Sequence, residues 1–289
     1  MSTKRGMGWL HDLPDVRDYT TRHPIIAPAL VKSGVLASAI EPAAATVPAS
    51  IDLRNYASPI EDQGELGSCT AHAAAGIIEL MERRVHGSHI DASRLFIYKA
   101  TRNLMGVTGD SGAYLRQTMG AIALFGACPE RFWPYQPADF DKEPTAFHYG
   151  FADHYSALLY HRLDPPNATR PQILAAVKTH LAAKLPAMFG FTVYDNIADA
   201  DATGRIPFPG ARSRVDGGHA VAAVGYADNM DIAGERGALL VRNSWGAGWG
   251  EEGYGWLPYA YVLQGLADDW WVASKLAWLN TGAFDLKAA

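Results

Sequence analysis

The spacing of hydrophobic positions follows a helical period in much of the first half of the chain. Over residues 69–84, alanines are followed by three larger apolar side chains on one stripe, and Ser68 stands where it can cap the helix. The same reasoning predicts three more helices, over residues 93–103, 114–125 and 171–184. We therefore expect a mainly helical first part of the molecule.

Beyond Pro186 the apolar runs become short, and Gly, Asn and Asp separate them, which is typical of strands. The predicted strands cover residues 187–193, 219–226, 237–243 and 253–257. Between the helical and strand patterns, residues 129–170 are rich in proline, aromatic residues and histidine and are predicted to be mostly loop. Helices first and strands later indicate an α+β architecture with two lobes of different class.

The first 50 residues have no clear period of either kind. Residues 1–24 mix charged residues with Trp9 and several aspartates, which suggests that this part is docked onto the rest of the protein. Residues 25–50 are rich in Ala, Pro, Ser and Val and are predicted to form an extended linker or a strap over the surface. A plain flexible tail is the alternative.

Composition excludes several classes of protein. The net charge of −5 does not suit a duplex-DNA binder, so no nucleic-acid partner is expected. No apolar run is long enough to span a membrane, and the first residues lack the apolar core of a secretory signal, which leaves the compartment open. Two cysteines among 289 residues are too few for a disulfide scaffold.

One of these cysteines, Cys69, stands at the start of the predicted helix over residues 69–84. The positive end of a helix dipole favours thiolate over thiol, so this position suits a nucleophile. Gln63 precedes it by six residues across a glycine-rich turn, and its amide can fold back beside the Cys69 backbone N–H. Two such donors next to a nucleophile predict an oxyanion hole.

Two later segments supply partners for this cysteine. His219 enters an apolar strand after two glycines, and Asn243 ends another strand in the string Asn-Ser-Trp-Gly-Ala-Gly-Trp-Gly. We expect Asn243 to accept a hydrogen bond from one ring nitrogen of His219 while the other nitrogen faces Cys69. Trp245 is predicted to shield the Asn–His bond from water.

With these segments the chain resembles the papain-like cysteine peptidases, in the family's order of Gln, Cys, His and Asn over roughly residues 50–265. The resemblance implies a two-lobe fold, with a mainly helical lobe, a β-barrel-like lobe and the active-site cleft between them. It implies that Cys69 is the nucleophile, His219 the acid and base, Asn243 the orienting residue and Gln63 an oxyanion donor. The implied domains are an N-terminal segment over 1–47 and a peptidase domain over 48–289, divided into a helical lobe to about 150, a β lobe to about 270 and a tail over 271–289.

The resemblance also implies hydrolysis of peptide or protein substrates through a covalent acyl-enzyme, by a monomer, with no cofactor and no metal. The residues implied to bind substrate are Gly112, Ala113, Tyr114, Leu115, Gly217, Gly218 and, on the leaving-group side, Trp249. Four residues depart from the usual family pattern, namely Leu66, Thr70, Ala113 and Gly218. None of these departures removes a catalytic group.

Several alternatives stay open at this point. A catalytically silent relative acting as a binding module, or a thiol acyltransferase, would use the same framework, although both Cys69 and His219 are present. Packing roles are favoured for Cys128 and for His72, which lies nearly one helical turn after Cys69. The pair His86 and His89 lacks a third ligand at useful spacing, so a loop role is favoured over metal binding.

The N-terminal segment suggests a regulatory hypothesis. Its position before the catalytic domain predicts a short inhibitory strap that lies along the cleft or over the lobe interface until it is cleaved or displaced. Deletion of residues 1–24 is then expected to raise activity on small substrates. A purely structural role, in which the chain folds only with these residues, is the competing hypothesis.

Overall fold

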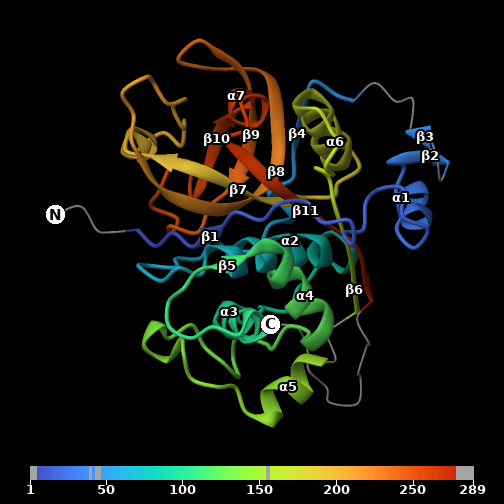
Figure 1. Cartoon of the computed structure of the whole chain (residues 1–289), viewed down its shortest axis with the longest axis vertical. Helices are drawn as coiled ribbons and strands as arrows, with labels where there is room; N and C mark the ends of the chain where they lie inside the picture. Colours follow the sequence, from blue (N-terminus) through green and yellow to red (C-terminus); the bar gives the residue numbers. More distant parts are fainter. Residues whose placement is uncertain (1–4, 39–40, 43–46, 154–156, 278–289) are drawn as a thin grey trace.

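A computed structural model of the protein describes residues 5–38, 41–42, 47–153 and 157–277. Figure 1 shows a sheet in the upper part and a group of helices in the lower part, with the long helix α2 between them. The helices of the lower part are α2 (Cys69–His86), α3 (Arg94–Met105), α4 (Leu115–Phe125) and α5 (Ala146–Asp153). Three further helices are α1 (Ala27–Lys32), α6 (Arg170–Ala182) and α7 (Tyr259–Leu263).

The sheet has seven strands, in the order β10-β9-β8-β7-β11-β6, and β4 also pairs with β8. All of these pairings are antiparallel. The strands are β4 (Ser50–Asp52), β6 (Ala157–Arg162), β7 (Ala187–Tyr194), β8 (Val215–Ile232), β9 (Glu235–Arg242), β10 (Tyr254–Pro258) and β11 (Ala267–Ala277). Within the described residues this path has two ends, so the lobe is an open, antiparallel sheet rather than a closed barrel.

Helix α2 lies in the middle of the hydrophobic core. Its first fourteen residues are all buried, and it ends at Gly87, whose φ of 75° a residue with a side chain rarely adopts. Ser68 stands at the expected cap position, but its side chain makes no capping hydrogen bond. The hydroxyl instead bonds to the Tyr135 hydroxyl at 2.7 Å, so that part of the prediction is wrong. Packing, rather than the cap, fixes the start of this helix.

The predicted helices and strands are confirmed within a few residues, except that β8 extends well beyond the predicted residues 219–226 at both ends. The region between the helical and strand patterns is more ordered than expected. Residues 129–170, predicted to be mostly loop, contain α5 and β6. Strand β11 continues to Ala277, so residues 271–277, which were assigned to a C-terminal tail, are strand instead. The remainder of that tail, residues 278–289, lies outside the described residues.

The N-terminal region is also structured. Residues 25–50 include α1. Ile26, just before this helix, and Leu30, within it, are both fully buried, so this region is not simply an extended linker. Two short strands, β2 (Leu36–Ser38) and β3 (Glu41–Pro42), pair with each other. Before them, β1 (Trp9–Leu10) pairs in parallel with β5 (Ala113–Tyr114). Figure 1 shows β1 crossing between the sheet and the helices of the lower part.

No helix among the described residues is long and apolar enough to cross a membrane.

Candidate active site

Cys69 is the first residue of α2, and its side chain is fully buried. The turn before it contains Gly64 at a φ of 60°, and the Gly67 N–H donates to the Asp110 carboxylate at 3.0 Å and 3.1 Å. The backbone N–H of Ala220 in β8 donates to the Cys69 sulfur at 3.3 Å. The sulfur therefore lies where the tip of the helix meets the sheet.

His219 is the residue before Ala220, and its ring is fully buried. Its Nε2 lies 2.8 Å from Oδ1 of Asn243, which directly follows β9. The Ser244 backbone N–H also donates to this Oδ1, at 2.8 Å, which fixes the orientation of the Asn243 amide. Because an amide oxygen only accepts, Nε2 carries the proton in this bond and the neutral ring is unprotonated at Nδ1. Nδ1 is buried and has no hydrogen-bond partner in the described part of the chain.

Trp245 covers the His219 ring on one face. The two rings are stacked, with centroids 4.5 Å apart and planes 20° apart, and Trp249 meets Trp245 edge-on at 5.4 Å. Both indoles are buried. This arrangement keeps water away from the bond between His219 and Asn243, as the sequence predicts.

Gln63 is fully buried and is held across the boundary between the lobes by Ser244. Its backbone N–H donates to the Ser244 carbonyl at 2.9 Å, and its Oε1 accepts from the Ser244 hydroxyl at 2.5 Å. Its Nε2 donates to the carbonyl of Leu66, in the loop that leads to Cys69, at 2.7 Å. These contacts turn the amide nitrogen toward the loop before Cys69, the side on which an oxyanion donor is expected.

The N-terminal segment lies across these residues. The Gly6 N–H donates to the Gly64 carbonyl at 2.8 Å, and the Trp245 Nε1–H donates to the Gly6 carbonyl at 3.3 Å. The Gly8 N–H donates to the Gly218 carbonyl at 3.1 Å, while the Gly8 carbonyl accepts from the Ala113 N–H at 2.7 Å. We call residues 5–19 the strap.

Most of the predicted substrate-binding residues contact the strap. A Cβ on Gly112 would collide with the Gly8 carbonyl, and one on Gly217 would lie 2.7 Å from the Met7 sulfur. Ala113 and Tyr114 pair with Trp9 and Leu10. The Trp9 side chain lies against Gly190 and Gly218, so the strap occupies the place predicted for substrate. Leu115 differs, because it begins α4 and is fully buried in the core.

Comparisons with known proteins point to one family. Residues 47–264 match the family model described as papain family cysteine protease. Xylellain, a cysteine protease from Xylella fastidiosa whose crystal structure is known, is 32% identical with a TM-score of 0.72, covering 94% of this chain and 96% of that one. The chain belongs to the papain family of cysteine proteases. The expected two-lobe papain-like fold and the assignment as a hydrolase are thereby confirmed.

Two further relatives of this papain-family chain differ in how much of the chain their similarity covers. An uncharacterised peptidase C1-like protein of Acanthamoeba polyphaga mimivirus is 32% identical over 283 residues, covering 94% of this chain and 88% of that protein. Chymopapain of Carica papaya is 24% identical over 217 residues, covering 72% of this chain and 54% of that protein. The first of these similarities covers more of the chain than the residues 47–264 that the family model matches.

The ionisation of Cys69 and His219 in this papain-family protein differs from the expectation of a thiolate. Burial raises the pKa of the Cys69 thiol to about 12, although backbone N–H groups, including those of Ala220 and Gly8, favour the thiolate. Burial lowers the pKa of His219 to about 4, despite its hydrogen bond to Asn243. With the strap in place, desolvation outweighs the helix dipole, and both groups are neutral at neutral pH.

Two residues that contact the site were missed by the sequence analysis. Ser244 stands inside the Asn-Ser-Trp string, so its proximity to Gln63 could have been found from that motif. Asp201 could not, because its partner Arg5 is 196 residues away in the chain. Its carboxylate accepts from Arg5 Nη1 at 2.6 Å and Nη2 at 2.8 Å and from the Trp249 Nε1–H at 3.2 Å.

The remaining candidates lie apart from this site. Cys128 is a free, buried thiol in a second small cluster of apolar side chains, which agrees with a packing role. His72 is buried, and its Nδ1 lies 3.1 Å from the Ser68 carbonyl and its ring meets Tyr135 edge-on. Among the described residues, no group of three or more metal-ligating side chains gathers, at His86 and His89 or elsewhere.

Proposed function

We propose that Cys69 is the nucleophile, and His219 the general acid and base, of this cysteine peptidase. The Cys69 thiol gives its proton to Nδ1 of His219, and the thiolate attacks the carbonyl carbon of a peptide bond. His219 then protonates the leaving nitrogen, the C–N bond breaks and a thioester with Cys69 remains. The observation that carries this proposal is the 2.8 Å bond between His219 Nε2 and Asn243 Oδ1, which leaves Nδ1 unpartnered on the strand that contacts Cys69.

The second half of the reaction uses the same groups. His219 takes a proton from water, the hydroxide attacks the thioester, and the acid product leaves as the sulfur is reprotonated. In both halves the developing oxyanion accepts hydrogen bonds from the Gln63 amide and the Cys69 backbone N–H. Asn243 keeps the imidazole in its tautomer and orientation throughout, and it acts as a positioning residue.

We further propose that the strap inhibits the enzyme by occupying its cleft. Three features support this proposal: Cys69 and His219 are fully buried, the strap backbone bonds to residues of both lobes, and Trp9 fills a slot beside Gly190 and Gly218. A substrate cannot reach the sulfur while the strap is bound. The neutral Cys69 thiol and His219 ring are also the unreactive forms of the pair.

The backbone of Gly8 in the strap is hydrogen-bonded to both lobes, which disfavours its cleavage by Cys69. The Gly8 N–H donates to the Gly218 carbonyl at 3.1 Å. The Gly8 carbonyl accepts from the Ala113 N–H, away from the Gln63 amide. The strap therefore behaves as a tethered inhibitor rather than as a bound substrate.

Substitution of Gly8 tests both proposals in the full chain. A Cβ at this position would collide with the Gly67 carbonyl, so Gly8→Val must displace the strap. We expect Gly8→Val to hydrolyse a fluorogenic dipeptide amide at least tenfold faster than the wild type. We also expect a thiol-directed epoxide to label Cys69 faster, by a similar factor. Added Cys69→Ala should abolish both signals.

Gly210→Val is the matched control, because Gly210 is exposed and has open space where a side chain would lie. It should behave like the wild type. Equal labelling and equal turnover in Gly8→Val and the wild type would overturn the inhibitory role of the strap. A displaced strap with no turnover and no labelling of Cys69 would overturn the proposed roles of Cys69 and His219.

A further inference from the structure

Asp201 presents a fixed carboxylate at the edge of the cleft. It follows a short 3₁₀ turn (Ile197–Ala200), and its carbonyl accepts from the Gly250 N–H at 2.8 Å. Its Oδ1 accepts from the Trp249 Nε1–H at 3.2 Å. These contacts come from the peptidase domain, so they hold the carboxylate in place whether or not the strap is bound.

The group bound to this carboxylate is a guanidinium. Arg5 of the strap donates from Nη1 and Nη2 to the two Asp201 oxygens, at 2.6 Å and 2.8 Å. Its Cζ also lies 4.9 Å from the centroid of the Trp245 ring. Two parallel hydrogen bonds and an aromatic face match the planar shape of arginine much better than the ammonium of lysine. Among the described residues, Arg5 is the one cation paired with Asp201.

The position of Trp245 shows which part of a substrate passes this carboxylate. His219 protonates the leaving nitrogen in the proposed mechanism, so the leaving side of the substrate must pass next to its ring. Trp245 is stacked on that ring, and Arg5 lies over Trp245. The Asp201 carboxylate therefore borders the path of the residues that follow the scissile bond.

We propose that Asp201, with Trp245 and Trp249, forms a subsite for an arginine side chain on the leaving side of the substrate, and that Arg5 of the strap fills this subsite in the closed enzyme. This inference rests on the proposed peptide hydrolysis and adds a substrate class to it. Once the strap leaves, the Asp201 carboxylate loses its ion pair with Arg5. The guanidinium of a substrate arginine then forms the same two hydrogen bonds. Partly exposed ion pairs with this fork geometry are strong enough for a preference of about tenfold.

The test uses the full chain carrying Arg5→Gln and Gly8→Val, so that the strap neither covers the cleft nor competes for Asp201. Internally quenched peptides carry arginine at the first, second or third position after the scissile bond, each beside a twin with neutral citrulline. We expect kcat/KM for one arginine peptide to exceed that of its twin by about tenfold. Asp201→Asn should reduce that ratio to one.

Asp199→Asn is the matched control, because it removes the same charge from an exposed residue two positions away. It should preserve the arginine-to-citrulline ratio. A ratio of one at all three positions in the opened enzyme would overturn the inference, and so would equal loss of the ratio in Asp199→Asn and Asp201→Asn.

Binding separates this inference from the proposed hydrolysis. With Cys69→Ala added, fluorescence anisotropy gives the Kd of each labelled peptide without turnover. A tenfold tighter Kd for the arginine peptide, lost in Asp201→Asn, supports the subsite even if the opened enzyme cleaves nothing. Cleavage of a fluorogenic amide without any arginine preference in Kd or kcat/KM supports the hydrolysis and rejects the subsite.

Discussion

At the scale of single residues, the proposed closure of the strap has a free-energy cost that is seen in the ionisation of Cys69 and His219. Both are fully buried beneath it, which raises the pKa of the thiol and lowers that of the imidazole. Arg5 adds a positive charge that further disfavours the imidazolium. In the proposed opening of the strap, each ionised form is therefore more stable in the open enzyme than in the closed one, so we expect closure to depend on pH.

The sign of this dependence follows from His219. Its pKa falls from an ordinary 6.5 to about 4 in the closed state, so the open state takes up a proton first as pH falls. Between these two values closure weakens by about tenfold for each pH unit. We expect the closed fraction, measured from the NMR signal of 5-fluorotryptophan at Trp9, to decrease between pH 7 and pH 5. Burial raises the pKa of Asp269, which accepts from Trp9 Nε1, to about 7, so this carboxyl also titrates in the range and some change of the signal remains in His219→Gln. The same decrease in His219→Gln as in the wild-type chain would contradict the prediction.

At the scale of elements, α2 is held by a buried carboxylate at its centre. Glu79 is fully buried and accepts hydrogen bonds from the Ser58 hydroxyl at 2.5 Å, the Ala92 N–H at 3.0 Å and Arg94 Nη2 at 3.1 Å. Arg242, the residue before Asn243, donates to the Ser58 carbonyl at 2.6 Å. This network ties the helix that carries Cys69 to the strand that leads to Asn243.

Removal of Glu79 should therefore destabilise the protein strongly. Glu79→Ala leaves the buried Arg94 and the Ala92 N–H without this partner, and breaking a buried pair in this way costs about 3–5 kcal/mol. We expect a decrease of that size in the free energy of unfolding, measured by urea denaturation followed by tryptophan fluorescence. Glu65→Ala, at an exposed position, should change it by less than about 0.5 kcal/mol. Equal effects of the two substitutions would show that the network contributes little.

The elements also show what the sequence could predict. Helices α2, α3 and α4 and strands β7 to β10 were predicted because each follows a local period. Strand β11 was missed because it is irregular: Asp269 has a φ of 63° and pairing shifts register between Asp268 and Trp271. The order of this strand depends on an ion pair with Arg162, which stands more than a hundred residues earlier in the chain. The Arg162 Nη1 lies 3.3 Å from the Asp269 carboxylate.

The residues of the candidate site also divide into those with a local sequence pattern and those without one. Cys69, His219, Asn243 and Gln63 were predicted because each stands in a short motif, and the structure brings them together. Arg5 and Asp201 carry no such motif, and only the path of the strap places them next to each other. Local patterns thus predicted the groups proposed for chemistry, whereas tertiary contacts were needed to find the groups proposed for regulation and specificity.

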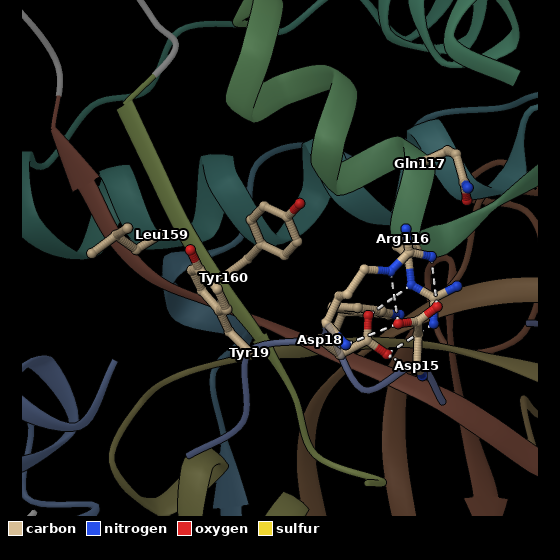
Figure 2. Close-up of a pocket in the computed structure, with 9 residues that line it drawn as sticks. Asp15, Asp18, Tyr19, Arg116, Gln117, Leu159 and Tyr160 are labelled. Atoms are coloured by element: carbon tan, nitrogen blue, oxygen red, sulfur yellow. Dashed lines mark hydrogen bonds and ion pairs between the residues drawn. The ribbon is translucent and has the colours of Figure 1, made fainter. Parts of the chain in front are cut away.

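At the scale of the whole molecule, the strap is attached at both ends. Near Cys69 it bonds to Asp201 and to the backbones of both lobes, and Trp9 Nε1 donates to the buried Asp269 at 3.1 Å. Farther along, Arg116 of α4 binds the strap carboxylates of Asp12 and Asp18, as Figure 2 shows for Asp18. Because the second attachment is remote from Cys69, it should control opening without touching the residues proposed for catalysis.

Arg116→Ala tests whether this remote attachment controls the cleft. The substitution removes charge-assisted hydrogen bonds to Asp12, to Asp18 and to the Leu13 carbonyl, each worth about 1.5–3 kcal/mol when fully formed. Even one such bond corresponds to about a tenfold change in the opening equilibrium. We therefore expect a thiol-directed epoxide to label Cys69 at least tenfold faster in Arg116→Ala than in the wild type.

Arg17→Ala provides the control for loss of a guanidinium. Arg17 is exposed and donates to Asp15 within the strap itself, so its removal leaves the contacts between the strap and the peptidase domain in place. The epoxide should label Cys69 of Arg17→Ala at the wild-type rate. If Cys69 of Arg116→Ala is also labelled at that rate, the contacts near Cys69 close the cleft on their own, and release must begin at Arg5 rather than at α4.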